Sequence, residues 1–150
     1  MINQYKGSRS IYWNTPKEMY NKIMKEFKDY NPENSLIDPF YLDTKKYYDE
    51  KVFINPPFNI LNKKEWIDTI RNLLINKNKL MLLLPARTDT IQFHKLLKLG
   101  FEVYFIKGRL NYNDQGPAPF PSIIMYKGIT RSYIKELIKW TNKKQEKNNR

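Results

Sequence analysis

The stretch LMLLLP, residues 80–85, decides which fold class this chain can adopt. Five apolar residues follow one another without a polar interruption, and a proline ends the run. Such a run is typical of a strand that is buried on both faces, because apolar and polar residues need not alternate when neither face meets water. The stretch therefore predicts a central strand of a parallel sheet packed between helices.

Candidate helices flank this run and the chain ends. Apolar residues at helical spacing predict one helix through 66–74. Another begins at Thr88 or Asp89 and ends at Gly100. Near the N-terminus, Thr15 and Glu18 form a capping box around Pro16, and the apolar face of that helix continues to Phe27. A terminal helix is predicted at 132–140.

Short apolar runs predict further strands at 35–38, 52–54, 101–106 and 123–126. No helix is predicted between the last two strands, so we expect them to be antiparallel neighbours. The order predicts an α/β fold with a Rossmann-like, mostly parallel sheet, a C-terminal antiparallel strand and helices on both faces. The expected domains are a flexible N-terminus at 1–10, a single folded domain at 11–140 and a basic tail at 141–150.

The composition favours a polyanionic partner. The chain has 27 Lys and Arg against 15 Asp and Glu, which gives a formal net charge of +12. This charge is spread along the sequence and favours nucleic acid over an anionic membrane surface. A proteome rich in Lys and Asn would also produce such a protein without any polyanionic partner.

Other parts of the composition exclude several classes of site. Cysteine is absent, which excludes disulfides and cysteine-ligated zinc. The first residues, MINQYKGSRSIYW, lack the apolar segment of a signal peptide, and no apolar run approaches about 18 residues. We expect a protein of the cytoplasm, or of the host cytoplasm if it is viral, with no membrane span and no metal site.

Three predicted strands end in residues suited to ligand binding: Asp38-Pro39, Asn55-Pro56-Pro57-Phe58 and Pro85-Ala86-Arg87. In open α/β sheets, ligands bind at the carboxyl ends of strands. The two prolines of the second stretch remove backbone donors, so the carbonyls of Asn55 and Pro56 have no sheet partners and the Asn55 side-chain oxygen adds a third acceptor.

Three acceptors beside an aromatic ring fit a planar amino group on a ring that stacks against Phe58. If that amine attacks an electrophile, fixed acceptors stabilise the positive charge that develops on its nitrogen. The alternative is a proline-stiffened loop with a capping Asn55 and a core Phe58. The position at a strand end favours the functional interpretation.

The stretch Asn55–Phe58 resembles the (D/N/S)-P-P-(Y/F) motif of S-adenosylmethionine-dependent amino-methyltransferases. Further stretches occur in the order found in the short phage-type DNA N6-adenine methyltransferases, the phage Dam family: YWNTP (12–16), IDPF (37–40), LLPARTDTIQFH (83–94), GRL (108–110) and APFPS (118–122). The resemblance covers roughly residues 10–128. It implies methyl transfer from S-adenosyl-L-methionine to the N6 amine of adenine in DNA, with the base flipped into the Asn-Pro-Pro-Phe pocket.

The resemblance also implies roles for single residues. The catalytic motif is Asn55, Pro56, Pro57 and Phe58, in which Asn55 and the Pro56 carbonyl hold the amine and Phe58 stacks on the base. The cofactor site is assigned to Trp13, Thr15, Asp38, Phe40 and Asn55, with Asp38 as the acidic residue that ends the first strand.

The sequence departs from the family pattern in the cofactor half of the site. No glycine follows Asp38-Pro39, where a glycine-rich loop is usual. Sixteen residues, 39–54, separate Asp38 from Asn55, too few for the two further strand–helix units of a full methyltransferase sheet. We therefore expect a minimal sheet that is reduced on the side after the first strand. The acidic residue that holds the cofactor ribose is left open between Asp43 and Asp49.

Three residues outside the motif are candidates for contact with nucleic acid. Arg87 and Arg109 suit phosphate groups, and Phe120 can form a wall against the flipped base. Their alternatives are a surface ion pair or loop brace for the arginines and a core plug for Phe120. His94, the only histidine, is expected to be structural.

Two other functions fit the same residues. The chain can be a methyltransferase-like subunit that binds nucleic acid or a partner without activity, which the missing glycines favour and the intact Asn55–Phe58 disfavours. It can instead methylate adenine in RNA, because nothing in the sequence distinguishes a 2′-hydroxyl. Methylation of a glutamine side chain uses a similar motif, but the positive charge argues against it. The oligomeric state is left open.

Overall fold

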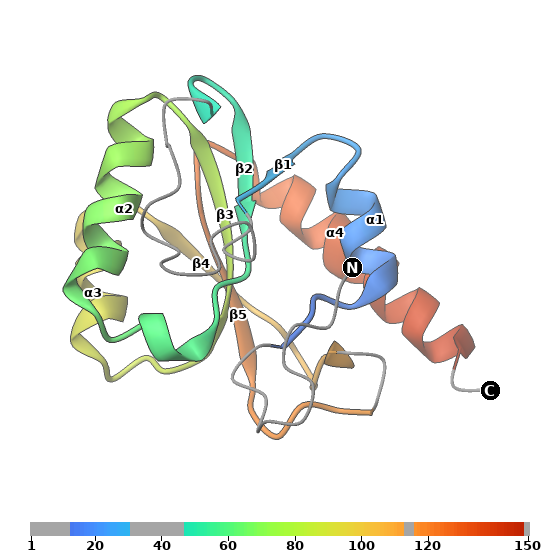
Figure 1. Ribbon diagram of the computed structural model, residues 1–150. Coiled ribbons are helices and arrows are strands. Elements are labelled where there is room, and N and C mark those ends of the chain that lie inside the picture. Colours follow the sequence, from blue (N-terminus) through green and yellow to red (C-terminus); the bar gives the residue numbers. More distant parts are fainter. Residues whose placement is uncertain (1–12, 31–46, 113–115, 149–150) are drawn as a thin grey trace.

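The structure is a computed structural model that describes residues 13–30, 47–112 and 116–148 (Figure 1). The strands in these segments are β1 (Lys28–Asp29), β2 (Lys51–Ile54), β3 (Lys79–Pro85), β4 (Glu102–Phe105) and β5 (Ser122–Lys127). The α-helices are α1 (Lys17–Ile23), α2 (Lys64–Ile75), α3 (Ile91–Lys98) and α4 (Arg131–Asn148), and a short 3₁₀ turn, η4 (Phe58–Ile60), follows β2. The N-terminus expected at 1–10 lies outside the described residues.

The strands form one sheet in the order β1-β2-β3-β5-β4. β1, β2 and β3 are parallel, whereas β5 is antiparallel to both of its neighbours, β3 and β4. At the centre, Met81 of β3 lies opposite Phe53 of β2 on one side and Tyr126 of β5 on the other. The predicted α/β class is confirmed, with a mostly parallel sheet and an antiparallel C-terminal strand.

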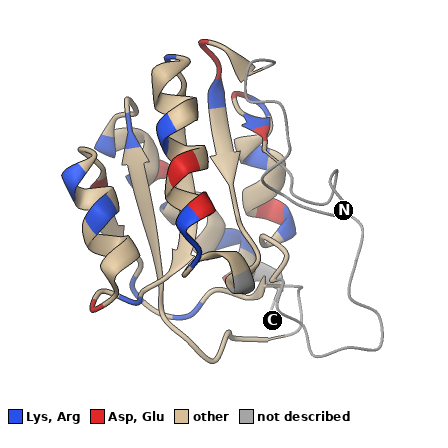
Figure 2. Ribbon diagram, turned by 60° about the vertical axis from the view of Figure 1, so that its left-hand side comes forward, with Lys and Arg blue, Asp and Glu red and all other residues tan. Residues whose placement is uncertain are grey.

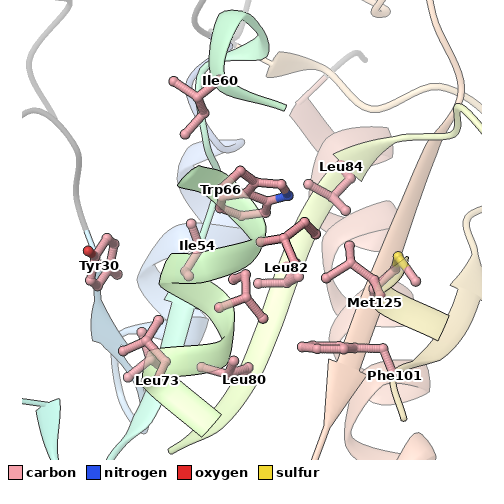
Figure 3. Packing of buried hydrophobic residues seen from close by; sticks show 14 of the residues in the cluster. Tyr30, Ile54, Ile60, Trp66, Leu73, Leu80, Leu82, Leu84, Phe101 and Met125 are labelled. Atoms are coloured by element: carbon pink, nitrogen blue, oxygen red, sulfur yellow. The ribbon is translucent and has the colours of Figure 1, made fainter. Parts of the chain in front are cut away.

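β3 is buried on both faces, as its apolar run predicts. Leu80, Leu82 and Leu84 pack in one core cluster with residues of α2 and α3, including Trp66 and Leu96 (Figure 3). The residues between them, Met81 and Leu83, pack in a second cluster with residues of α1 and α4 on the other face: Met19, Ile23, Ile134, Leu137 and Ile138. Figure 1 shows the two helix pairs on opposite sides of the sheet.

The first described strand differs from the prediction. β1 lies at Lys28–Asp29, where no strand was predicted, and it overlaps the turn-rich stretch DYNPEN (29–34). It forms because it pairs with β2, and the Tyr30 amide continues this pairing by donating to the Phe53 carbonyl at 2.9 Å. Tertiary pairing thus overrides the local turn preference. The predicted strand at 35–38 lies outside the described residues.

Three helix boundaries also differ. Helix α1 ends at Ile23, before Phe27, and no side chain caps its start. Helix α3 is capped by Thr90, whose hydroxyl accepts from the Phe93 amide, and not by Thr88 or Asp89. Helix α4 continues past 140 to Asn148, so most of the segment expected to be a basic tail is helical.

Contacts of Trp140 and Thr141 account for the extension of α4 past residue 140. Thr141 is fully buried, and its hydroxyl donates to the Leu137 carbonyl at 2.9 Å. The Trp140 ring receives two lysine ammonium groups, Lys22 at 4.6 Å and Lys144 at 4.5 Å from the ring centroid. These contacts extend the packed face of α4 beyond the apolar residues that predicted it.

Among the described residues, no helix is both long and apolar enough to cross a membrane. Lys and Arg residues are distributed over the helices and the strand ends, with Asp and Glu among them (Figure 2).

The burial of β3 generates a test of the core. Replacing Leu82, which is fully buried, with alanine removes packing on the α2–α3 face of the sheet. We expect Leu82→Ala to lower the free energy of unfolding by about 2–5 kcal/mol, measured by urea denaturation. The control is Ile75→Ala, because Ile75 of α2 is 75% exposed, and it should change stability by no more than about 0.5 kcal/mol. Equal losses in both variants would contradict the burial of β3 on the α2–α3 face.

Candidate active site at the carboxyl end of β2

The chain changes direction sharply where β2 ends. Asn55, Pro56 and Pro57 are buried, and the 3₁₀ turn η4 begins immediately at Phe58. The Pro57 carbonyl accepts from the Ile60 amide at 3.3 Å, which closes the turn. The carbonyls of Asn55 and Pro56 accept no backbone hydrogen bond from any described residue. Two acceptors are therefore left at the strand end, as the two prolines predict.

The side chain of Asn55 is held in one orientation. Its Nδ2 atom donates to the Trp13 carbonyl at 2.6 Å and to the Thr15 hydroxyl at 2.9 Å. A carbonyl oxygen can only accept, so the atom that faces Trp13 must be the amide nitrogen. The amide oxygen, Oδ1, consequently points the other way, and it has no hydrogen-bond partner among the described residues. Asn55 thus presents a fixed acceptor beside the two backbone carbonyls.

The Thr15 hydroxyl bonds to the Asn55 amide and does not cap the helix that follows it. A capping box at Thr15 and Glu18 is wrong, because α1 begins at Lys17 without a side-chain cap and the Thr15 hydroxyl accepts from Asn55. Trp13 and Thr15 thereby lie against Asn55, although about 40 positions separate them in the chain. Trp13, Thr15 and Asn55, which the sequence analysis assigned to one site, therefore lie together.

Four aromatic rings gather beside this amide, and Phe120 lies at their centre. Its ring centroid is 5.1 Å from that of Phe58 and 5.4 Å from those of Trp13 and Tyr112. We call Trp13, Phe58, Tyr112 and Phe120 the site aromatic cluster. Phe58, Phe120 and Trp13 are partly exposed, so their rings are accessible to a ligand. Phe120 also packs against the core cluster on the α1–α4 face, so it is both a core contact and a partly exposed ring.

Tyr112 is a member of the site that sequence reasoning missed. Its hydroxyl and the Ser122 hydroxyl are 2.8 Å apart, and both residues are buried. Burial raises the pKa of Tyr112, partly offset by the hydrogen bond to Ser122, so the phenol stays neutral at physiological pH. The only signal in the sequence was its place in the long loop NYNDQGPAPFP (111–121), which carries Phe120.

The two predicted arginines occupy different places. Arg109 is exposed, and its Nη1 atom donates to the Ala118 carbonyl at 3.3 Å, so it braces the loop that carries Phe120. Arg87 is exposed just after β3 and lines a cavity of about 270 Å³ between α2 and α3. Phe58 lines this cavity as well, so the aromatic residue of the motif belongs both to the site aromatic cluster and to the cavity lining. We call it the α2–α3 cavity.

The cofactor half of the predicted site is described only in part. Asp38, Phe40 and Asp43 lie outside the described residues. Asp49 is described, but its amide donates to the Asn76 carbonyl before β2 begins, at the opposite end of that strand from Asn55. Asp49 is therefore wrong as a residue of this site.

Asp29 is a described acidic residue at a strand end, as the sequence predicted for Asp38. It is the acidic residue that ends the first described strand, and it lies opposite Phe53, two residues before Asn55. One of its carboxylate oxygens accepts from the Tyr20 hydroxyl at 2.9 Å. Sequence reasoning missed Asp29 because β1 is only two residues long.

The described residues contain no group of His, Asp and Glu that could hold a metal ion. His94 contacts the Thr88 carbonyl through Nε2 at 2.9 Å, in keeping with a structural role. Comparison of the chain with protein-family models, curated proteins and solved structures gave no significant match.

The anchoring of Asn55 can be tested without an activity assay. In Thr15→Val one acceptor of the Asn55 amide is lost, so we expect the side-chain NH₂ resonances of Asn55 to shift and stability to fall by about 1 kcal/mol. NMR spectroscopy and urea denaturation measure the two effects. Thr141→Val is the matched control, because its buried hydroxyl bonds within α4. It should lose similar stability and leave the Asn55 resonances in place. Unmoved resonances in Thr15→Val would contradict the geometry.

Proposed function

We propose that this protein transfers a methyl group from S-adenosyl-L-methionine to the N6 amine of adenine in DNA. The observation that carries the proposal is the orientation of the Asn55 amide. Its nitrogen is bound to Trp13 and Thr15, so its oxygen is left as an acceptor beside the carbonyls of Asn55 and Pro56. The phage Dam resemblance and the antiparallel C-terminal strand β5 support the same proposal.

The acceptors explain how the site would favour the reaction. S-adenosyl-L-methionine supplies an electrophilic methyl group when it is bound. Asn55 Oδ1 and the Pro56 carbonyl accept from the two N–H groups of the amine and orient its lone pair. As the nitrogen–methyl bond formed and the methyl–sulfur bond broke, a neutral thioether would leave and the positive charge would pass to that nitrogen, where fixed acceptors would stabilise it more than they stabilise the neutral amine. The excess proton is then released to solvent, and no general base is required.

The aromatic residues would hold the base that carries the amine. An adenine inside a duplex is inaccessible, so it must leave the stack before its amine reaches Asn55. Phe58 and Phe120, whose centroids are 5.1 Å apart, offer two partly exposed rings against which such a base can pack. Stacking is tolerant of geometry and contributes about 1–3 kcal/mol per base.

The described residues near Asn55 fit a cationic methyl donor. A sulfonium group prefers oxygen acceptors and aromatic faces, and the Asn55 backbone carbonyl and the Trp13 ring would supply one of each. Trp13 and Thr15, together with Asp29 at the end of β1, would form the described part of the cofactor site. Asp38 and Phe40 remain proposed members from the resemblance.

The charge of the chain supports DNA as the substrate. A formal charge of +12 attracts phosphates. Binding releases counterions from the DNA, and because this release is less favourable at higher salt, the affinity falls as salt rises. Arg87 and Arg109 are both exposed near the site and suit contacts that hold the strand without reading its sequence.

A second candidate is a nucleic-acid-binding subunit without activity, which the absence of glycine from 31–42 favours. Calorimetric titration with S-adenosyl-L-methionine separates the two, since no detectable binding with or without DNA would exclude the enzyme. Methylation of RNA is distinguished in the assay below.

We expect the purified protein to transfer labelled methyl groups to unmethylated DNA, tested in parallel with RNA and protein, and to yield N6-methyladenine on nucleoside analysis. Asn55→Ala should abolish turnover because it removes the oriented acceptor, while circular dichroism shows a retained fold. The control Asn72→Ala changes an exposed asparagine of α2 and should keep full activity. An active Asn55→Ala would exclude the assigned role of Asn55.

Phe58→Ala should weaken capture of the extruded base by about 1–3 kcal/mol, because one stacking ring is lost. The measurement is the apparent affinity for DNA that contains 2-aminopurine at the target position, together with the rate of methyl transfer. Phe105→Ala is the matched control, because Phe105 of β4 is 63% exposed and outside the site aromatic cluster. If Phe58→Ala behaves like Phe105→Ala in both measurements, Phe58 does not hold the base.

A further inference from the structure

The α2–α3 cavity lies beside the site but is separate from it. It opens at the carboxyl end of β3 and is lined by Phe58, Trp66, Leu84, Arg87, Gln92 and Phe93, among others. Most of this lining is apolar. The cavity volume of about 270 Å³ lies just below the roughly 300 Å³ at which pockets for small molecules begin, so it suits a single ring system.

Two buried polar atoms of the cavity lining have no partner. Trp66 is 2% exposed, and its Nε1 atom finds no hydrogen-bond acceptor among the described residues. Figure 3 shows this nitrogen on the side of the ring that faces Leu84, another lining residue. Gln92 donates through Nε2 to the Asn62 carbonyl at 3.1 Å, and its buried Oε1 atom has no partner in the described chain.

These atoms define the chemistry of a ligand. An unpaired buried donor or acceptor costs about 1–3 kcal/mol, and because both atoms are inaccessible to solvent in the free protein, a ligand recovers this cost when the two side chains turn toward the cavity. Trp66 offers one donor and Gln92 one acceptor, so the ligand needs an acceptor and a donor on a small ring. Phe58 and Phe93 supply aromatic walls for that ring. Arg87 is exposed and lines the same cavity, where a guanidinium suits a phosphate.

We propose that the α2–α3 cavity binds a nucleobase of the same strand next to the target base, with Arg87 on its phosphate. This proposal rests on the proposed function, because it uses the same DNA strand. Phe58 forms a T-shaped pair with Phe120 and also lines the cavity, so the two base sites share this ring. Trp66 and Gln92 then read the hydrogen-bonding edge of the neighbouring base, which supplies a sequence preference without a separate recognition domain.

Binding is tested by NMR through the indole N–H resonance of Trp66, which is identified by its absence from Trp66→Phe. The four deoxynucleoside monophosphates and adenine-free single-stranded oligonucleotides are titrated separately, which distinguishes free nucleotides from bases within a strand. We expect a saturable downfield shift for at least one base. Arg87→Gln should weaken binding of that nucleotide about tenfold, whereas the control Arg71→Gln, on α2 and paired with Asp68, should not.

The variants keep the test independent of folding and of activity. Gln92→Leu removes the acceptor without touching Trp66, so it should flatten differences in affinity among the four bases even if Trp66→Phe folds poorly. A Trp66 resonance that stays in place with every nucleotide and oligonucleotide overturns the proposal, whether or not methyl transfer occurs. A shift in a protein that transfers no methyl group would instead retain the base site and remove the proposed enzyme activity.

Discussion

The burial of β3 on both faces is the constraint on which the rest of the structure depends. A strand whose residues alternate between two apolar cores requires a helical layer on each side and a neighbour at each edge. β2 and β5 satisfy the edges, and the helix pairs α2–α3 and α1–α4 satisfy the faces. This arrangement places the ends of β2 and β3 together, so Asn55 and Arg87 follow adjacent strands.

The Asn55 amide then connects this frame to the start of the chain. Residues 13–15 precede α1 on one face of the sheet, and two hydrogen bonds from one nitrogen tie them to the end of β2. The same bonds decide which atom of the amide is left for a ligand. Packing and the proposed chemistry would therefore depend on one side chain, which is 6% exposed.

Local patterns were sufficient to predict most of the fold and part of the candidate site. The apolar run at 80–84 predicted β3, the missing helix between the last strands predicted their antiparallel pairing, and the prolines predicted the unpaired carbonyls of Asn55 and Pro56. Each of these features is set by the residues of one short segment. The roles of the site residues stay predictions.

Features that depend on distant residues could not be predicted in this way. β1 has two residues and owes its strand conformation to β2. The Thr15 hydroxyl fits either a helix cap or a distant amide, and only the folded chain decides between them. The burial and hydrogen bonding of Tyr112 and of the Trp66 nitrogen, which has no partner among the described residues, likewise depend on neighbours far along the sequence.

The site is assembled from residues 13–15, 55–58 and 116–122, with Tyr112, and these residues together span most of the domain. The site can form only when all three segments are present and folded, so a partly folded chain lacks it. Because such sequence-distant contacts are formed only with the complete topology, loss of the site and loss of the fold should be a single cooperative event. Ligand binding would then report directly on the fraction of molecules that are folded.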